Sequence, residues 1–210
     1  MLAAVDRAVV LDPNNPTGER AGPDRLRRIA LALGAGRLIV DAAFADGDEG
    51  TSFDPVTHEA IVLRSVGKFF GLAGIRLGFA LGHKATVDAL RRAVAPWGVA
   101  HPTRWIGTRA LADRDWQIDQ RARIRDTQAW LRARLVAAFP QQLVVSGGSF
   151  VTVFFSAEGA AAAAHAELAS RAVFTRLGDN RRWLRFGLPP EHQRERLSAA
   201  LRHVDGDTNP

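Results

Sequence analysis

The sequence predicts an α/β fold with a mainly parallel sheet, followed by a smaller α+β region. Three short, largely β-branched apolar runs indicate strands buried on both faces; they span residues 8–11, 38–41 and 60–63. Between the first two runs, residues 23–33 have apolar positions at helical spacing and a proline in the first turn, which predicts a crossover helix. The order strand, helix, strand, strand is typical of a parallel sheet.

The remainder of the chain predicts long helices and then a mixed region. Helical spacing covers residues 105–111 and 118–139 and stops near Pro140. The later elements are predicted strands at 143–145, 150–155, 172–174 and 183–186, and helices at 159–170 and 190–204. We therefore divide the chain into a partial large domain (1–100), connecting helices (101–139) and a small C-terminal domain (140–210).

Polar side chains follow each of the three predicted parallel strands. Asn15 follows the first, Asp41 ends the second, and Ser65 and Lys68 follow the third. In open parallel sheets, ligands bind at the carboxyl ends of the strands, so these distant residues are expected to converge there.

Lys68 is unusual in this chain, because only Lys68 and Lys84 among the 28 basic residues are lysines. A lysine, unlike an arginine, can lose its proton and attack an aldehyde. Ser65 and Arg76 are suited to bind a phosphate by charge-assisted hydrogen bonds. A Schiff-base lysine beside a phosphate anchor is the arrangement that pyridoxal phosphate requires. Asp41 would keep the pyridine nitrogen protonated, and the Asn15 amide could donate to the phenolate oxygen.

These residues resemble the fold-type I pyridoxal phosphate enzymes of the aminotransferase class I/II group. The resemblance rests on the order of three motifs: Asn-Asn-Pro-Thr-Gly at 14–18, Asp41 after a strand, and Ser65-x-x-Lys68 followed by Arg76. It implies a fold-type I large domain with a small C-terminal domain, and pyridoxal 5'-phosphate as cofactor. It also implies that Lys68 is catalytic, that Asn15, Asp41, Ser65 and Arg76 bind the cofactor, and that the enzyme is a homodimer.

A narrower resemblance points to threonine-phosphate decarboxylases. It rests on residues 41–46, on 63–79, on Pro96-Trp97, and on Trp183-Leu-Arg-Phe-Gly-Leu-Pro189. It implies decarboxylation of L-threonine O-3-phosphate, a small phosphorylated amino acid, to aminopropanol phosphate in cobalamin biosynthesis, with Arg185 binding the substrate carboxylate. Histidinol-phosphate aminotransferases are the nearest relatives of this group, so transamination is the alternative activity.

The chain departs from the family pattern in several places. Asp12, Ala42 and Phe44 stand where relatives often have Asn, Glu and Tyr. The first motif also comes soon after Met1, whereas family members have a sizeable preceding segment that contributes to the phosphate site and stacks a ring on the cofactor. We therefore expect a C-terminal portion of such an enzyme, which works with a missing N-terminal half or is a non-catalytic fragment.

Other interpretations of the same residues are weaker. Ser65-x-x-Lys68 also fits serine β-lactamases, but their Lys-Thr-Gly and Ser-Asp-Asn partners do not occur here. Gly67-Lys68 is not a P-loop, because Phe69 stands where Ser or Thr should bind magnesium. Taken singly, Asn15 could be a turn residue, Asp41 a helix cap and Arg185 an exposed strand residue.

Composition restricts the function further. The chain has no cysteine, its six histidines lack metal-ligand spacing, and no apolar run is long enough to cross a membrane. We therefore expect no metal, no membrane partner and, without a signal peptide, a cytoplasmic location. The net charge of +6 comes from arginines dispersed among acidic residues, so no nucleic-acid partner is expected.

Overall fold

The computed structural model describes residues 5–47 and 53–204 and forms two compact units. The N-terminal unit comprises the chain up to Asn15 together with Glu19–Arg121. The C-terminal unit comprises Pro16–Gly18 and the chain from Ala122 onward. The fold is mixed α/β with a partly parallel sheet, as the sequence predicts.

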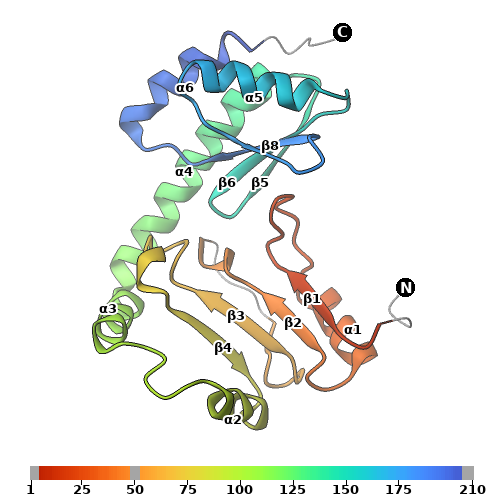
Figure 1. The fold of residues 1–210 in the computed structure, drawn as a ribbon, viewed down its shortest axis with the longest axis vertical. Helices are drawn as coiled ribbons and strands as arrows, with labels where there is room; N and C mark the ends of the chain where they lie inside the picture. The colour runs from red at the N-terminus through yellow and green to blue at the C-terminus, as the bar shows by residue number, and fades with distance from the viewer. Residues whose placement is uncertain (1–4, 48–52, 205–210) are drawn as a thin grey trace. The chain divides into compact units, whose positions relative to one another are not determined.

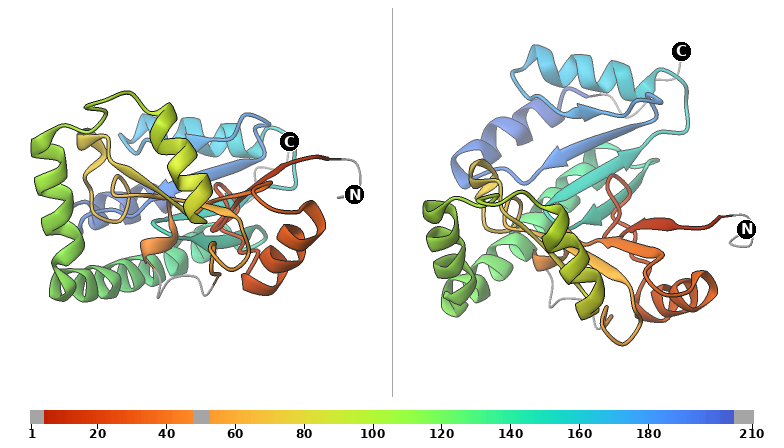
Figure 2. Two further views of the ribbon diagram at one scale, coloured as in Figure 1. Left: turned by 90° about the horizontal axis from the view of Figure 1, so that it is seen from below. Right: turned by 60° about the horizontal axis from the view of Figure 1, so that its bottom comes forward.

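The N-terminal unit is built on a four-stranded sheet of order β1-β2-β3-β4 (Figure 1). β1 (Ala8–Leu11), β2 (Leu38–Asp41) and β3 (Ile61–Ser65) are parallel, and β4 (Gly78–Gly82) runs antiparallel to β3. The three predicted strands are confirmed to within two residues. The crossover helix is confirmed as α1 (Pro23–Leu33), which lies beside β1 and β2 in every view (Figure 2).

One face of this sheet is packed. Leu26 and Ala30 of α1 are buried in one cluster with Val40 of β2 and Val62 of β3. Leu26 and Ala30 are four positions apart, so they lie on one face of the helix, and Val40 pairs in register with Val62, so these two lie on one face of the sheet. Side chains alternate between the two faces of each strand, and this alternation determines which of them face α1.

The opposite face of the same sheet is open. Val9 is 62% exposed, Leu11 37% and Leu63 38%, although all three lie in strands. Residues at alternate strand positions point to opposite faces, so these side chains project away from α1. These exposed aliphatic side chains give that face of the sheet an apolar surface.

Three helices follow the sheet: α2 (Lys84–Ala93), α3 (His101–Ala112) and α4 (Arg114–Ala138). The predicted helices at 105–111 and 118–139 are confirmed, with earlier starts. The break between α3 and α4 has a local cause: the buried Gln117 amide donates to the Ala110 and Leu111 carbonyls, and the Asp113 carboxylate accepts from the Trp116 amide. The sequence did not predict α2, none of whose residues is buried.

The C-terminal unit contains a second four-stranded sheet of order β5-β6-β8-β7. Its strands are antiparallel: β5 (Leu143–Gly147), β6 (Phe150–Phe154), β7 (Arg176–Leu177) and β8 (Trp183–Gly187). The helices are α5 (Ala160–Ser170) and α6 (Arg194–Leu201), and short 3₁₀ turns occupy Ala45–Gly47, Ala73–Ile75 and Glu191–Gln193.

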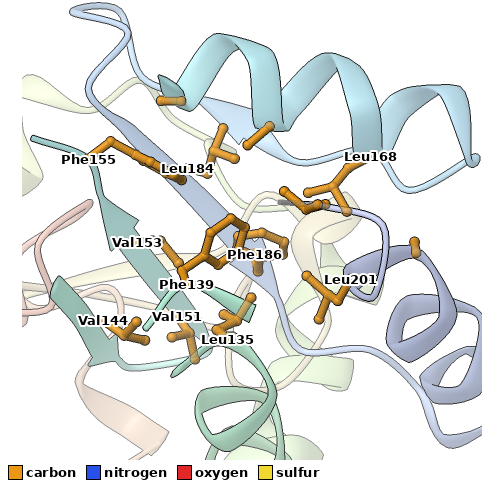
Figure 3. Close-up of a cluster of buried hydrophobic side chains, with 14 of the residues drawn as sticks. Leu135, Phe139, Val144, Val151, Val153, Phe155, Leu168, Leu184, Phe186 and Leu201 are labelled. Carbon is orange, nitrogen blue, oxygen red and sulfur yellow. The ribbon is translucent and has the colours of Figure 1, made fainter. Parts of the chain in front are cut away.

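The core of this unit lies between one face of the sheet and its helices (Figure 3). Val151 and Val153 of β6 pair in register with Phe186 and Leu184 of β8, so the four side chains share one face. Leu135 of α4, Phe139 directly after that helix, Leu168 of α5 and Leu201 of α6 complete the cluster. The opposite face therefore carries the alternate residues, including Thr152 and Arg185.

The predicted strand at 172–174 is wrong, because the end of α5 uses these residues. The Arg171 and Val173 amides donate to the Leu168 carbonyl, and the Ala172 amide donates to the Ala169 carbonyl. Ala172 takes a left-handed conformation with a φ of 56°. The strand in this region is instead the short β7, two residues further on.

Candidate active site

The Asn15 loop begins at the end of β1 and is anchored by Asp12. The Asp12 amide donates to the Asp41 carbonyl at 3.0 Å, which ties the start of the loop to the end of β2. The Asp12 side chain is 1% exposed, and its Oδ1 accepts from the Ala21 amide at 3.2 Å. These bonds close a loop that presents a half-buried Asn15 beyond the carboxyl end of β1.

The next residues of this loop belong to the C-terminal unit. Thr152 is fully buried, and its Oγ1 donates to the Pro16 carbonyl at 2.7 Å. Gly18 packs directly on β5: a Cβ there would lie 2.5 Å from the Ser146 carbonyl oxygen, and one on Gly147 would lie 2.4 Å from Gly18 Cα. The sequence did not predict this glycine contact, because no local pattern reports it.

We expect Gly18→Ala to destabilise the C-terminal unit. Gly18 has a φ of 73°, where a side chain is strained, and its Cβ would also collide with backbone. The free energy of unfolding should fall by about 2–4 kcal/mol in urea denaturation. Gly22→Ala is the control, since Gly22 has a φ of 74° but open space around its Cβ, and should cost about 1 kcal/mol. Equal losses would show that the packing contact contributes nothing.

Asp41 occupies the carboxyl end of the central strand. It pairs in register with Leu11 of β1 and Leu63 of β3, so its carboxylate projects on the open face of the sheet. The side chain is half-buried, and Oδ1 accepts from the Ala43 amide at 3.0 Å. A carboxylate has about four acceptor positions, so this local bond leaves capacity for a ligand.

Lys68 is presented by a turn that follows β3. Val66 and Phe69 are buried at 1% and 4% exposure, whereas Lys68 between them is exposed. Lys68 Nζ lies 5.4 Å from the ring centroid of Phe44, three residues after Asp41. The structure therefore brings the lysine to the segment that follows β2, as expected from the parallel strand order.

Ser65 and Arg76 bracket this turn. Ser65 is the last residue of β3, and its Oγ accepts from the Gly67 amide at 3.1 Å. Arg76 is exposed, has the left-handed φ of 53°, and donates one guanidinium hydrogen to the Ala73 carbonyl at 3.0 Å. A guanidinium has five N–H donors, so most of them can still serve an anionic group.

Arg185 lies in the C-terminal unit, whereas the other predicted site residues lie in the N-terminal unit. On β8 it pairs with Thr152 of β6 and Arg176 of β7, and its guanidinium lies 5.3 Å from the Phe150 ring centroid. Burial lowers the pKa of Arg185, and the like charge of Arg176 lowers it further. An arginine still stays protonated, so this half-buried cation favours an anionic group beside it.

The set of donors in the N-terminal unit fits pyridoxal phosphate. An exposed primary amine, a carboxylate at a strand end, and a hydroxyl and guanidinium around one turn match its aldehyde, pyridine nitrogen and phosphate. Among the described residues, no cluster of three or more His, Cys, Asp or Glu could hold a metal ion. No helix in the described ranges is both long and apolar enough to span a bilayer.

Comparison with known proteins identifies the family. The model of the aminotransferase class I and II family matches residues 6–204. The chain belongs to this family. Family membership indicates pyridoxal 5'-phosphate as the cofactor. The chain is similar to the threonine-phosphate decarboxylase of Pseudomonas aeruginosa, with 38% identity over 206 residues that cover 95% of this chain and 61% of that protein.

Aminotransferases of the same family are also similar. The histidinol-phosphate aminotransferase of Maricaulis maris is 32% identical over 187 residues, which cover 85% of this chain and 50% of that protein. The crystal structure of the Sinorhizobium meliloti histidinol-phosphate aminotransferase in complex with pyridoxal-5'-phosphate matches the fold with a TM-score of 0.82 at 22% identity, covering 93% of this chain and 56% of that one. The chain thus spans between half and two thirds of the length of these relatives.

Proposed function

We propose that this chain supplies the lysine-bearing part of a pyridoxal phosphate-dependent decarboxylase acting on L-threonine O-3-phosphate. The observation that carries the proposal is the 38% identity to a threonine-phosphate decarboxylase across 95% of the chain. The matches to histidinol-phosphate aminotransferases are weaker, at 32% identity, and extend over less of the chain. The product would be aminopropanol phosphate, which places the reaction in cobalamin biosynthesis.

Each site residue has a role in this proposal. Bound pyridoxal phosphate supplies an electron sink for charge that develops at the substrate Cα. Lys68 would hold the cofactor covalently, Asp41 would retain a proton on the pyridine nitrogen, and the Asn15 amide would donate a hydrogen bond to the phenolate oxygen. Ser65 and Arg76 bind the cofactor phosphate, and Arg185 binds the substrate carboxylate.

The reaction breaks the bond between Cα and the carboxylate, and CO₂ leaves. Arg185 would hold the carboxylate that leaves, and the Lys68 amine, once the substrate amine had displaced it from the cofactor, would return a proton to Cα. In the aminotransferase alternative, the Cα–H bond would break instead, and the displaced Lys68 amine would remove this proton. The matches to histidinol-phosphate aminotransferases support that second candidate.

Substrate assays separate the two candidates. The protein is loaded with pyridoxal phosphate and incubated with L-threonine O-3-phosphate, or with histidinol phosphate and 2-oxoglutarate. We expect CO₂ and an amine product from the first mixture and no glutamate from the second. Turnover of histidinol phosphate that depends on 2-oxoglutarate would contradict the decarboxylase assignment.

The open sheet face motivates a proposal about partners. Asp41 projects on that face between the exposed Leu11 and Leu63. Residues that covered this face would form one wall of the proposed cofactor site. The relatives are longer than this chain, and the family resemblance implies a segment before β1 in them. We propose that an N-terminal half of this kind, or a second copy in a homodimer, covers the face. Co-expression with the N-terminal segment of the Pseudomonas aeruginosa relative should therefore tighten cofactor binding, and unchanged binding would contradict this role.

A further inference from the structure

The turn that carries Lys68 is held by side chains outside the three motifs. Phe69 and Phe70 pack against Trp116 of α4, with ring centroids 5.5 Å and 5.7 Å away. The Arg121 guanidinium, further along α4, lies 5.3 Å from the Phe69 ring centroid. All four residues belong to the N-terminal unit, so α4 anchors the two aromatic residues directly after the lysine.

Arg121 also contacts the segment that follows β2. Its Nε donates to the Asp46 carbonyl at 3.1 Å. The Asp46 carboxylate pairs with Arg64, the residue before Ser65. The half-buried Arg121 guanidinium thus contacts both the backbone of the segment after β2 and the Phe69 ring in the turn after β3.

We propose that Arg121 is a positioning residue that fixes the turn presenting Lys68. Lys68 itself is exposed, so packing of its own side chain does not hold it in place. Its position depends on the buried Val66 and Phe69 on either side. A cation over the Phe69 face resists rotation of that ring out of its pocket, and the planar guanidinium can bond Asp46 at the same time. A lysine at 121 could supply the charge but not the planar fork.

The importance of this geometry for catalysis rests on the proposed function, but the test does not use cofactor or substrate. Three backbone hydrogen bonds report on the turn: the Gly71 amide to the Lys68 carbonyl at 3.1 Å, the Leu72 amide to the Val66 carbonyl at 3.2 Å, and the Val66 amide to the Leu77 carbonyl at 3.4 Å. Amide hydrogen exchange followed by mass spectrometry can measure the exchange rate of a peptide covering residues 66–72 and compare it with the rates of peptides from β1 and β2.

We expect Arg121→Gln to accelerate exchange of the 66–72 peptide by roughly five- to tenfold, which corresponds to losing one cation–π contact and one charged hydrogen bond. Peptides from β1 and β2 should change less than the 66–72 peptide, and the urea midpoint should fall only slightly. Arg121→Lys should give an intermediate acceleration, since it retains the charge. Arg125→Gln removes an exposed arginine from the same helix and should leave every peptide unchanged.

Two results would overturn the proposal. One is normal exchange of the 66–72 peptide in folded Arg121→Gln, and the other is an equal acceleration in β1 and β2, which would indicate general destabilisation. If Arg121→Gln does not fold, Arg121→Lys decides by the same comparison between peptides. The exchange experiment does not measure turnover. Failure of the decarboxylase assay would therefore not affect the conclusion about Arg121, and failure of the exchange experiment would not affect the proposed decarboxylase activity.

Discussion

Lys68→Ala should abolish covalent attachment of pyridoxal phosphate and lower any turnover by at least about 10²–10⁴-fold, the usual contribution of an acid–base group. The variant lacks both the amine that forms the Schiff base and the group that would return a proton to the substrate. Lys68 is exposed, and the residues that hold its turn are its buried neighbours Val66 and Phe69. The fold should therefore survive the substitution.

The measurement is the visible absorption of the protein mixed with pyridoxal phosphate and then desalted. Lys84→Ala is a matched control, because Lys84 is the other lysine of the chain, is exposed and pairs with Asp88 on the surface of α2. We expect the absorption band in the wild type and in Lys84→Ala, and its loss in Lys68→Ala. A band of equal size in Lys68→Ala would refute the assignment of this lysine.

The parallel sheet and its carboxyl-end residues are predictable because their signals are local. Each of the three parallel strands is a short apolar run, and the polar residue that matters comes within a few positions of its end. Strand order then determines that Asp41 lies between its neighbours, and the register with Leu11 and Leu63 agrees with this expectation. The approach of Lys68 to Phe44 follows from the same parallel topology.

The residues that the sequence did not reveal act over long separations. Arg121 contacts Asp46 across 75 positions, and Thr152 contacts Pro16 across 136. Neither Arg121 nor Thr152 lies in a motif, and Arg121 is one of several arginines on α4 with similar spacing. The misplaced strand at 172–174 has a related cause, since its apolar composition suits a strand but the last turn of α5 uses its backbone amides. Local composition cannot report such competition for hydrogen bonds.

Asp41→Asn separates two possible roles of Asp41. The Ala43 amide donates to Asp41 Oδ1 at 3.0 Å, so the carboxylate could serve only to close a turn. Asparagine retains an acceptor oxygen for that bond but has no charge to keep the pyridine nitrogen protonated. If charge is the role, turnover should fall by about 10²–10³-fold, as for loss of one strong electrostatic contact in an active site. Stability should stay nearly constant, since the turn is preserved.

Asp54→Asn provides the matched control for that experiment. Asp54 Oδ1 accepts from the Val56 amide at 2.9 Å, the same two-residue turn, but the side chain is exposed and lies in none of the three motifs. Hydrogen bonds from the Thr57 side chain and the Val56 amide lower the pKa of Asp54, so neighbouring residues stabilise its charge. We expect Asp54→Asn to leave cofactor absorption and turnover unchanged. If Asp41→Asn behaved in the same way, Asp41 would be a turn residue, and the partner of the pyridine nitrogen would have to be another group.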